Sequence, residues 1–255
     1  MLFTNSAAVL ALVGLAAAAP AKQEPRMLSH DDVVLPRADG GYDVMKDWQW
    51  TDIERRMEKQ ARERAEEEKR RVLAGETIPA GARIRSEAQP DLERRCDKTT
   101  EVQVLTDTQF TNWDVAMSPV IGATGGQATV AVSKGYSITN GITVGAGADW
   151  TIAKDVFSAS LKIDYSHSWT TSDTQTFTYF ITPGQYGLVV SNPYTRRLTG
   201  NVVTGCTDDP SYDPYTSDSY EDQNYSGMSW VAGPIRLCNS TTYPVPFCVG
   251  TGTHN

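Results

Sequence analysis

Histidines and catalytic sequence motifs are scarce in this sequence. Among 255 residues there are three histidines, of which His167 and His254 lie beyond residue 95. No Gly-x-Ser-x-Gly motif and no cysteine pair at zinc spacing occurs. His167 alternates with Ser166 and Ser168, which a strand would place on the opposite face, so no Ser-His-Asp arrangement is indicated. We therefore predict no catalytic residues, no metal ligands and no cofactor.

Positive charge is scarce in the C-terminal two thirds. Residues 96–255 hold 7 of the 23 Lys and Arg but 14 of the 31 Asp and Glu. Phosphate recognition requires clustered basic side chains, so we expect no nucleic-acid partner. The acids between residues 208 and 222 lack the Asp-x-Asp-x-Asp-Gly spacing of a calcium loop.

Long hydrophobic runs are also missing after the first residues. The apolar run at 7–19 is too short for a transmembrane helix and ends in small residues, as a secretory signal peptide does. No later segment is apolar for long enough to anchor the chain. We assign 1–21 to a signal peptide and expect a secreted, extracellular protein.

The four cysteines all follow residue 95, at Cys96, Cys206, Cys238 and Cys248. An even number of cysteines behind a secretory leader predicts two disulfides formed in an oxidising compartment. The spacing does not choose among the pairings.

The segment 22–95 is rich in charge. Residues 22–50 show no periodicity, and we interpret them as mobile. Residues 51–75 are predicted to form a helix, because Thr51 and Glu54 make a capping-box pattern and Gly75 stands at the C-cap position. Opposite charges four residues apart, such as Glu58 and Arg62, support that helix.

A dibasic pair, Arg94-Arg95, stands directly before Cys96. Its place at the boundary between the charged and β-rich parts resembles a processing site for the dibasic-specific protease of the fungal secretory pathway. The alternative is a solvated linker. We interpret 22–95 as a partly helical propeptide or linker and 96–255 as the mature domain.

Two long runs between residues 136 and 182 alternate apolar and hydroxylic residues. A period of two predicts strands at 136–152 and 157–170, joined as a central hairpin. Further strands are predicted at 101–105, 128–132, 174–182, 186–191, 198–203 and 230–237. This pattern predicts an all-β domain, an antiparallel β-sandwich with two disulfides.

The long Ser/Thr-alternating runs of residues 136–203 resemble the aerolysin-like pore-forming module, in which a hairpin refolds to line a membrane pore. This resemblance implies an elongated β protein that acts on membranes. The alternative is a soluble sandwich whose long strands bend at Gly141, Gly145 and Gly147.

Residues 207–226 are rich in Asp, Ser, Tyr and Pro and lack periodicity, which predicts a long loop. Tyrosines combine a large contact area with a hydrogen-bonding tip, so this segment is a candidate recognition loop, with Tyr212, Tyr215, Tyr220 and Tyr225. Two sequons, at Asn224 and Asn239, predict glycosylation.

A broader resemblance rests on motifs spread over the C-terminal part. The stretches 182–187, 190–193, 197–200, 205–206, 230–233 and 243–250 resemble a family of secreted, effector-like proteins from plant-associated filamentous fungi. That resemblance implies an extracellular protein without established enzymatic activity, so no functional residue is carried over.

The function predicted from these observations is a secreted, non-enzymatic, effector-like protein. After precursor processing it would bind a host or cell-surface protein or glycan. The alternatives are an aerolysin-like pore-forming toxin, for which a membrane would be the partner, and a carbohydrate-active enzyme.

Overall fold

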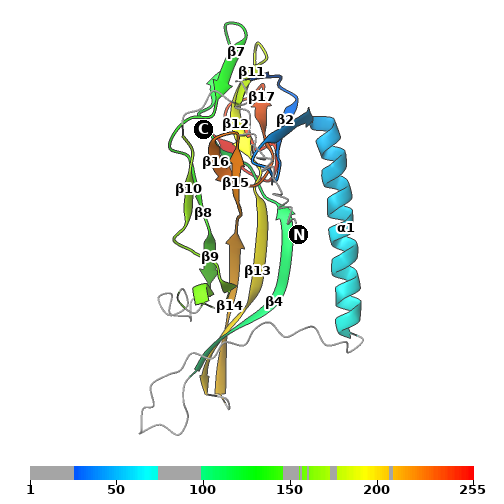
Figure 1. Cartoon of the computed structure of the whole chain (residues 1–255), viewed down its shortest axis with the longest axis vertical. Coiled ribbons are helices and arrows are strands. Elements are labelled where there is room, and N and C mark those ends of the chain that lie inside the picture. Colours follow the sequence, from blue (N-terminus) through cyan, green and yellow to red (C-terminus); the bar gives the residue numbers. More distant parts are fainter. Residues whose placement is uncertain are drawn as a thin grey trace, which may run out of the picture.

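The computed structural model describes residues 26–73, 99–145, 155, 157–159, 161–172, 177–206 and 209–255. Figure 1 shows an elongated molecule in which short strands gather at one end, long strands extend from them, and one helix runs alongside. The helix is α1 (Asp47–Leu73). The strands are β1 (Arg26–Leu28), β2 (Asp32–Pro36), β3 (Tyr42–Lys46), β4 (Thr99–Thr111), β5 (Val115–Ala116), β6 (Ile121–Gly122), β7 (Ala128–Ala131), β8 (Ser137–Thr139), β9 (Gly141–Val144), β10 (Ser168–Thr170), β11 (Phe177–Ile181), β12 (Tyr186–Ser191), β13 (Tyr194–Cys206), β14 (Asp209–Ser219), β15 (Asp222–Tyr225), β16 (Met228–Val231), β17 (Ile235–Ser240), β18 (Val245–Pro246) and β19 (Thr253–His254).

The end with the short strands, here called the head, contains two larger sheets. Their orders are β1-β11-β7 and β3-β2-β17-β12-β5, with β6 also paired to β12. All of these pairings are antiparallel except β1 with β11, which is parallel. The β-rich, mainly antiparallel fold predicted from the alternation is confirmed.

The head core contains side chains from both sheets and from the β15–β16 hairpin. Tyr179, Tyr225 and Trp230 are fully buried in it. The buried hydroxyls are paired: Tyr179 donates to the Ile235 carbonyl at 3.0 Å and Tyr225 to the Gly233 carbonyl at 2.6 Å. Such pairing lets the two tyrosines fill the core with their hydroxyl groups satisfied, whereas the buried indole N–H of Trp230 has no hydrogen-bond partner among the described residues.

The long strands form a second sheet system, here called the ribbon, with the order β4-β13-β14-β9 (Figure 1). Strand β13 pairs with β4 over almost its whole length, and the register shifts between Thr199 and Gly200. A Cβ at Gly200 would lie 1.8 Å from the Gln103 carbonyl oxygen, so only glycine fits at this bulge.

One face of the ribbon has its own small core, where the prediction of a second long strand is wrong. Residues 155, 157–159 and 161 are helical rather than extended. Phe157 and Leu161 are four residues apart, so one helical turn places both against Tyr215 and Leu198 of the ribbon. The alternating pattern also satisfies this helical spacing, which explains the error.

The first predicted run, 136–152, is not a continuous strand within the described part of the chain. It is divided into β8 and β9, which pair with different partners, β10 and β14. The break lies at Asn140, whose side chain donates to the Asp164 carbonyl and accepts from the Tyr220 amide. The prediction of a central hairpin is therefore wrong, because its second strand is not a long continuous strand. Among its described residues, only the short strands β8 and β10 pair with each other.

Residues 26–46 form strands β1, β2 and β3, so the prediction that 22–50 is mobile is wrong over these residues. Strand β1 pairs with β11, and β2 lies between β17 and β3. The whole segment has no regular period because β1 joins one head sheet and β2 and β3 join the other.

The predicted helix is confirmed, but it begins at Asp47 instead of Thr51. The Gln49 side chain accepts the Lys46 backbone N–H at 3.0 Å, which makes Lys46 the cap. Beyond its first turns, the α1 side chains that the structure describes are exposed to solvent and form ion pairs such as Glu58–Arg62 at 3.9 Å. No helix among the described residues is both long and apolar enough to cross a membrane.

Candidate functional site

A groove of about 1080 Å³ lies between α1 and the part of the ribbon next to the head. The middle turns of α1, between residues 54 and 64, form one wall, and the adjoining ends of β4, β13 and β14 form the other. The C-terminal segment closes it through Cys248 and Val249. This groove is the candidate functional site.

The α1 wall combines apolar and acidic side chains. Met57 is 41 % exposed and lines the groove with Glu54 and Glu58. Burial raises the pKa of Glu54 above its ordinary value, and the charge of Arg236 partly offsets that rise. A half-buried carboxyl group therefore lies at the base of the helix wall.

The ribbon wall is aromatic and rigid. Tyr194 is 37 % exposed in the groove, and burial together with the Glu54 charge raises its pKa to about 12. The Tyr194 amide donates to the Ala232 carbonyl at 2.8 Å, which fixes the backbone. Beside it, the Arg197 guanidinium lies 4.9 Å from the Phe110 ring centroid and forms two 2.7 Å hydrogen bonds with Asp218. Defined contacts thus hold the backbone at Tyr194 and the ring of Phe110 on this wall.

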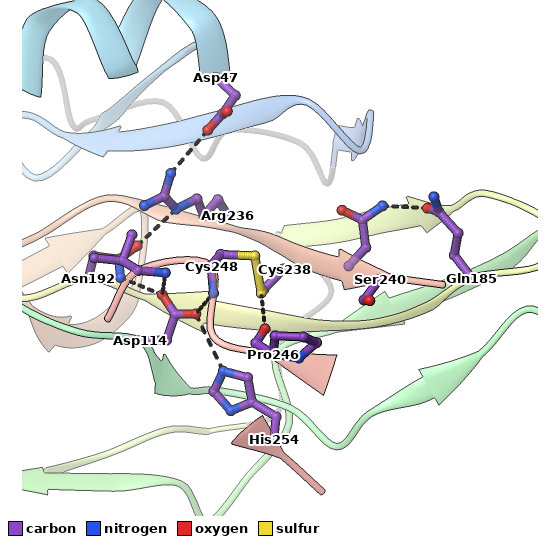
Figure 2. The surroundings of a disulfide bond; sticks show 12 residues. Asp47, Asp114, Gln185, Asn192, Arg236, Cys238, Ser240, Pro246, Cys248 and His254 are labelled. Atoms are coloured by element: carbon purple, nitrogen blue, oxygen red, sulfur yellow. Dashed lines mark hydrogen bonds and ion pairs between the residues drawn. A yellow bond between two sulfur atoms is a disulfide. The ribbon is translucent and has the colours of Figure 1, made fainter. Parts of the chain in front are cut away.

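A chain of polar contacts behind the groove joins α1 to the C-terminal segment, and Figure 2 shows it from Asp47 to His254. Arg236 donates from Nη1 to Asp47 at 3.0 Å and from Nε to the Asn192 amide oxygen at 2.9 Å. Asn192 in turn donates to Asp114 at 2.7 Å. Arg236 is 8 % exposed, so Asp47 supplies the carboxylate partner that a buried guanidinium requires.

The carboxylate of Asp114 lies at the centre of this network of polar contacts. Its side chain is fully buried and accepts the amides of Cys248 at 2.6 Å and Val249 at 3.1 Å. His254 Nε2 lies 3.4 Å from it. With Asn192 these donors satisfy the carboxylate, so Asp114 holds the C-terminal segment against the start of β5.

Asp114, His254 and Cys238 bring their ligand-type atoms within 4.8 Å of one another, which is compatible with metal spacing. The Cys238 sulfur, however, is bonded to Cys248 and is not a thiolate. The proximity of these three residues is therefore explained by their structural role in holding the C-terminal segment.

Of the two expected disulfides, the described residues contain one complete bridge, Cys238–Cys248, with the Cα atoms 5.7 Å apart. It closes the C-terminal segment next to Asp114 (Figure 2). Cys206 is also disulfide-bonded, and its partner lies outside the described part of the chain, as Cys96 does. The pairing that the sequence left open is thus settled for Cys238 and Cys248.

The predicted recognition loop is wrong over most of its length. Residues 209–225 form β14 and β15, and β14 pairs with β13 at eleven positions. Tyr215 and Tyr225 are buried in the ribbon core and the head core, and Tyr220 is partly buried. Only Tyr212, at 56 % exposure, presents a broad surface.

The two prolines in β14 are the reason that this strand was predicted as a loop. Pro210 and Pro214 are four residues apart, so both present the same edge of β14. The Pro214 carbonyl accepts from the Gly145 amide on the β9 side, and the missing N–H groups therefore face away from β13.

The two sequons lie in strands rather than loops. Asn224 is exposed in β15. Asn239 is partly buried in β17, and its amide nitrogen donates to the Gln185 side chain. The amide of Asn224 is therefore the more accessible of the two acceptors.

The remaining candidate residues are easily placed. Arg94, Arg95 and Cys96 lie outside the described residues. His167 packs edge-on against Trp169, with the ring centroids 4.3 Å apart, and its Nε2 is 3.4 Å from Asp222. In this cluster His167 and Asp222 are exposed and Trp169 is buried, and none of the three lines the groove.

Sequence reasoning did not find the groove. Tyr194 and Phe110 lie in ordinary strand patterns, and Glu54 belongs to a charged helix. Their proximity depends on where α1 docks, which no local pattern specifies. Comparisons with protein-family models, with curated proteins and with solved structures find no match for this chain.

Proposed function

We propose that this is a secreted, non-enzymatic, effector-like binding protein, whose target-binding surface is the groove between α1 and the ribbon. The observation that carries the proposal is the amphipathic lining, in which Met57 and Tyr194 remain more than one third exposed within a concave surface. Concave surfaces with apolar and aromatic walls and a few polar groups are typical binding sites.

The groove lining suits a host protein or glycan. Tyr194 and Phe110 offer aromatic faces, and Glu54, Glu221 and Arg64 place charges of both signs at the groove. Such a mixed lining favours a ligand with hydroxyl, amide or charged groups beside an apolar face.

The architecture that supports this surface is, in our proposal, a β-sandwich. The two head sheets contribute to one core, and the ribbon extends from it. Secretion through the signal peptide, processing at Arg94-Arg95, a second disulfide involving Cys96, and glycosylation of Asn224 complete the proposed precursor and its mature form.

A binding assay tests the groove. The labelled protein is incubated with intact plant cells and with immobilised cell-wall polysaccharides. Tyr194→Ala should weaken binding about tenfold or more, since a central tyrosine commonly contributes that much. Tyr243→Ala is the matched control, because Tyr243 is 56 % exposed and lies outside the groove. A folded Tyr194→Ala protein that binds as well as the parent would contradict the proposal.

Pore formation is the alternative function, and the length of the ribbon strands favours it. Strands β4 and β13 contain 13 residues each, more than the roughly 9–11 that a spanning strand needs. Dye release from liposomes of several compositions tests this alternative, and the absence of leakage would remove it.

A further inference from the structure

The N-terminal strands are joined to the rest of the chain by sheet hydrogen bonding. Strand β2 pairs with β17 through Val34 opposite Ile235 and Val33 opposite Arg236. Strand β1 pairs with β11 through three positions, among them Leu28 opposite Tyr179. The segment therefore contributes one strand, β1, to the first head sheet and two strands, β2 and β3, to the second.

The same segment also fills the head core. Leu28, Val33 and Val34 are fully buried, and the Tyr42 ring packs edge-on against Phe177 with the centroids 5.0 Å apart. Trp50, in the first turns of α1, is 3 % exposed. Without this segment the head would expose the groups that these side chains cover.

A buried charge depends on the segment as well. The guanidinium of Arg236, in β17, has its ion pair with Asp47 at 3.0 Å. Loss of Asp47 would leave this buried cation without a carboxylate partner, which is strongly unfavourable.

We infer that residues 26–50 act as a strand donor that remains bound after the chain is cut before Cys96, so that the processed protein is a two-chain complex. Residues 1–95 contain no cysteine, so the fragment would be held by noncovalent contacts alone. Because α1 continues directly from β3, the donor also retains the helix wall of the groove. The inference extends the proposed function, and it rests on that proposal only for the natural cleavage before Cys96.

An engineered cut tests retention independently of natural processing. The recognition sequence of a site-specific protease replaces residues 78–84, and the purified full chain is cleaved and passed over a size-exclusion column. Both fragments should elute together at the volume of the uncleaved protein and separate only in denaturant. Elution of the N-terminal fragment apart from a C-terminal fragment that keeps its β circular-dichroism spectrum would overturn the inference.

A matched pair of variants in β1 sharpens the test. Leu28→Ala should raise the dissociation constant of the cleaved fragments about 30-fold or more, as expected for a buried leucine. Met27→Ala, at a neighbouring side chain that is 46 % exposed, should change it less than about threefold. Equal effects of the two substitutions would show that β1 is not docked as described.

The outcomes separate this inference from the proposed function. An intact mass of the secreted protein that retains residues 93–95 on its C-terminal chain would refute natural processing, while the engineered cut would still decide retention. Conversely, the N-terminal fragment could be released while residues 96–255 bind the target as strongly as before. That result would refute retention and would also exclude α1 from the binding surface.

Discussion

Residues 26–46 and residues 51–73 are adjacent and both charged, yet the fold uses them in opposite ways. The first stretch supplies strands in which Leu28, Val33 and Val34 are fully buried, whereas most of the described side chains of the second are exposed along α1. Charged composition thus does not distinguish a structural strand from a solvated helix. The difference arises from where the few apolar residues dock.

The two tryptophans at the junction of these stretches offer the strongest test of that comparison. Trp50 is 3 % exposed and Trp48 is 70 % exposed, although they are two residues apart in the same helix. Trp50→Ala should lower the free energy of unfolding by about 3–5 kcal/mol, because a large buried ring leaves a cavity. Trp48→Ala should change it by less than about 0.5 kcal/mol. Urea unfolding followed by circular dichroism measures both, and similar midpoints for the two variants would contradict the docking of α1.

The ion pair at the helix start should give a smaller effect. Asp47→Ala removes the carboxylate that faces buried Arg236, and we expect a loss of about 1–2 kcal/mol, reduced from that of a fully buried pair because Asp47 is 48 % exposed. The control is Asp43→Ala, whose pair with Arg37 at 3.5 Å is exposed on both sides. A loss from Asp43→Ala as large as that from Asp47→Ala would show that burial of Arg236 does not matter.

The smallest expected effect is a pH dependence at Glu54. Burial raises the pKa of Glu54 above its ordinary value of 4.5, so the folded protein holds this proton more tightly than the unfolded chain. The resulting stability is present in full below the ordinary value and is lost as the pH rises through the raised pKa. Glu54→Gln should therefore melt at a higher temperature than the parent at neutral pH.

The difference in melting temperature between Glu54→Gln and the parent is the informative measurement, because Asp31 and Asp39 have pKa values lowered by Lys46 and Arg37 and act in the opposite direction. This difference should grow from about pH 4 to pH 7. A difference that shrinks over this range would contradict the assigned environment of Glu54.

Strand prediction succeeded where apolar residues mark the strand, by alternation in β11 and by a continuous buried run in β12. The prediction of 186–191 coincides with β12, and that of 174–182 contains β11, because both strands carry apolar residues toward the head core. It failed at β14, whose side chains are mostly polar and whose prolines suggested a loop. Pairing with β13, rather than side-chain hydrophobicity, makes that segment a strand.

The candidate site was predicted least well. The tyrosines of 212–225 were grouped by sequence proximity, but Tyr215 and Tyr225 belong to two separate cores. Tyr194 and Glu54 are distant in sequence, yet both line the groove. Contacts over such separations depend on the register of β2 against β17 and on the direction of α1, which local patterns do not encode.

By itself the sequence determined the β-rich character of the chain after residue 98 and the helix that begins near residue 47, because period and helix propensity are local properties. Only the tertiary structure decided that residues 26–50 complete the head, that residues 155, 157–159 and 161 turn helical against the ribbon, and that a groove opens beside α1. Each of these depends on which distant apolar surface a short segment covers, and the free energy of that burial outweighs local preference.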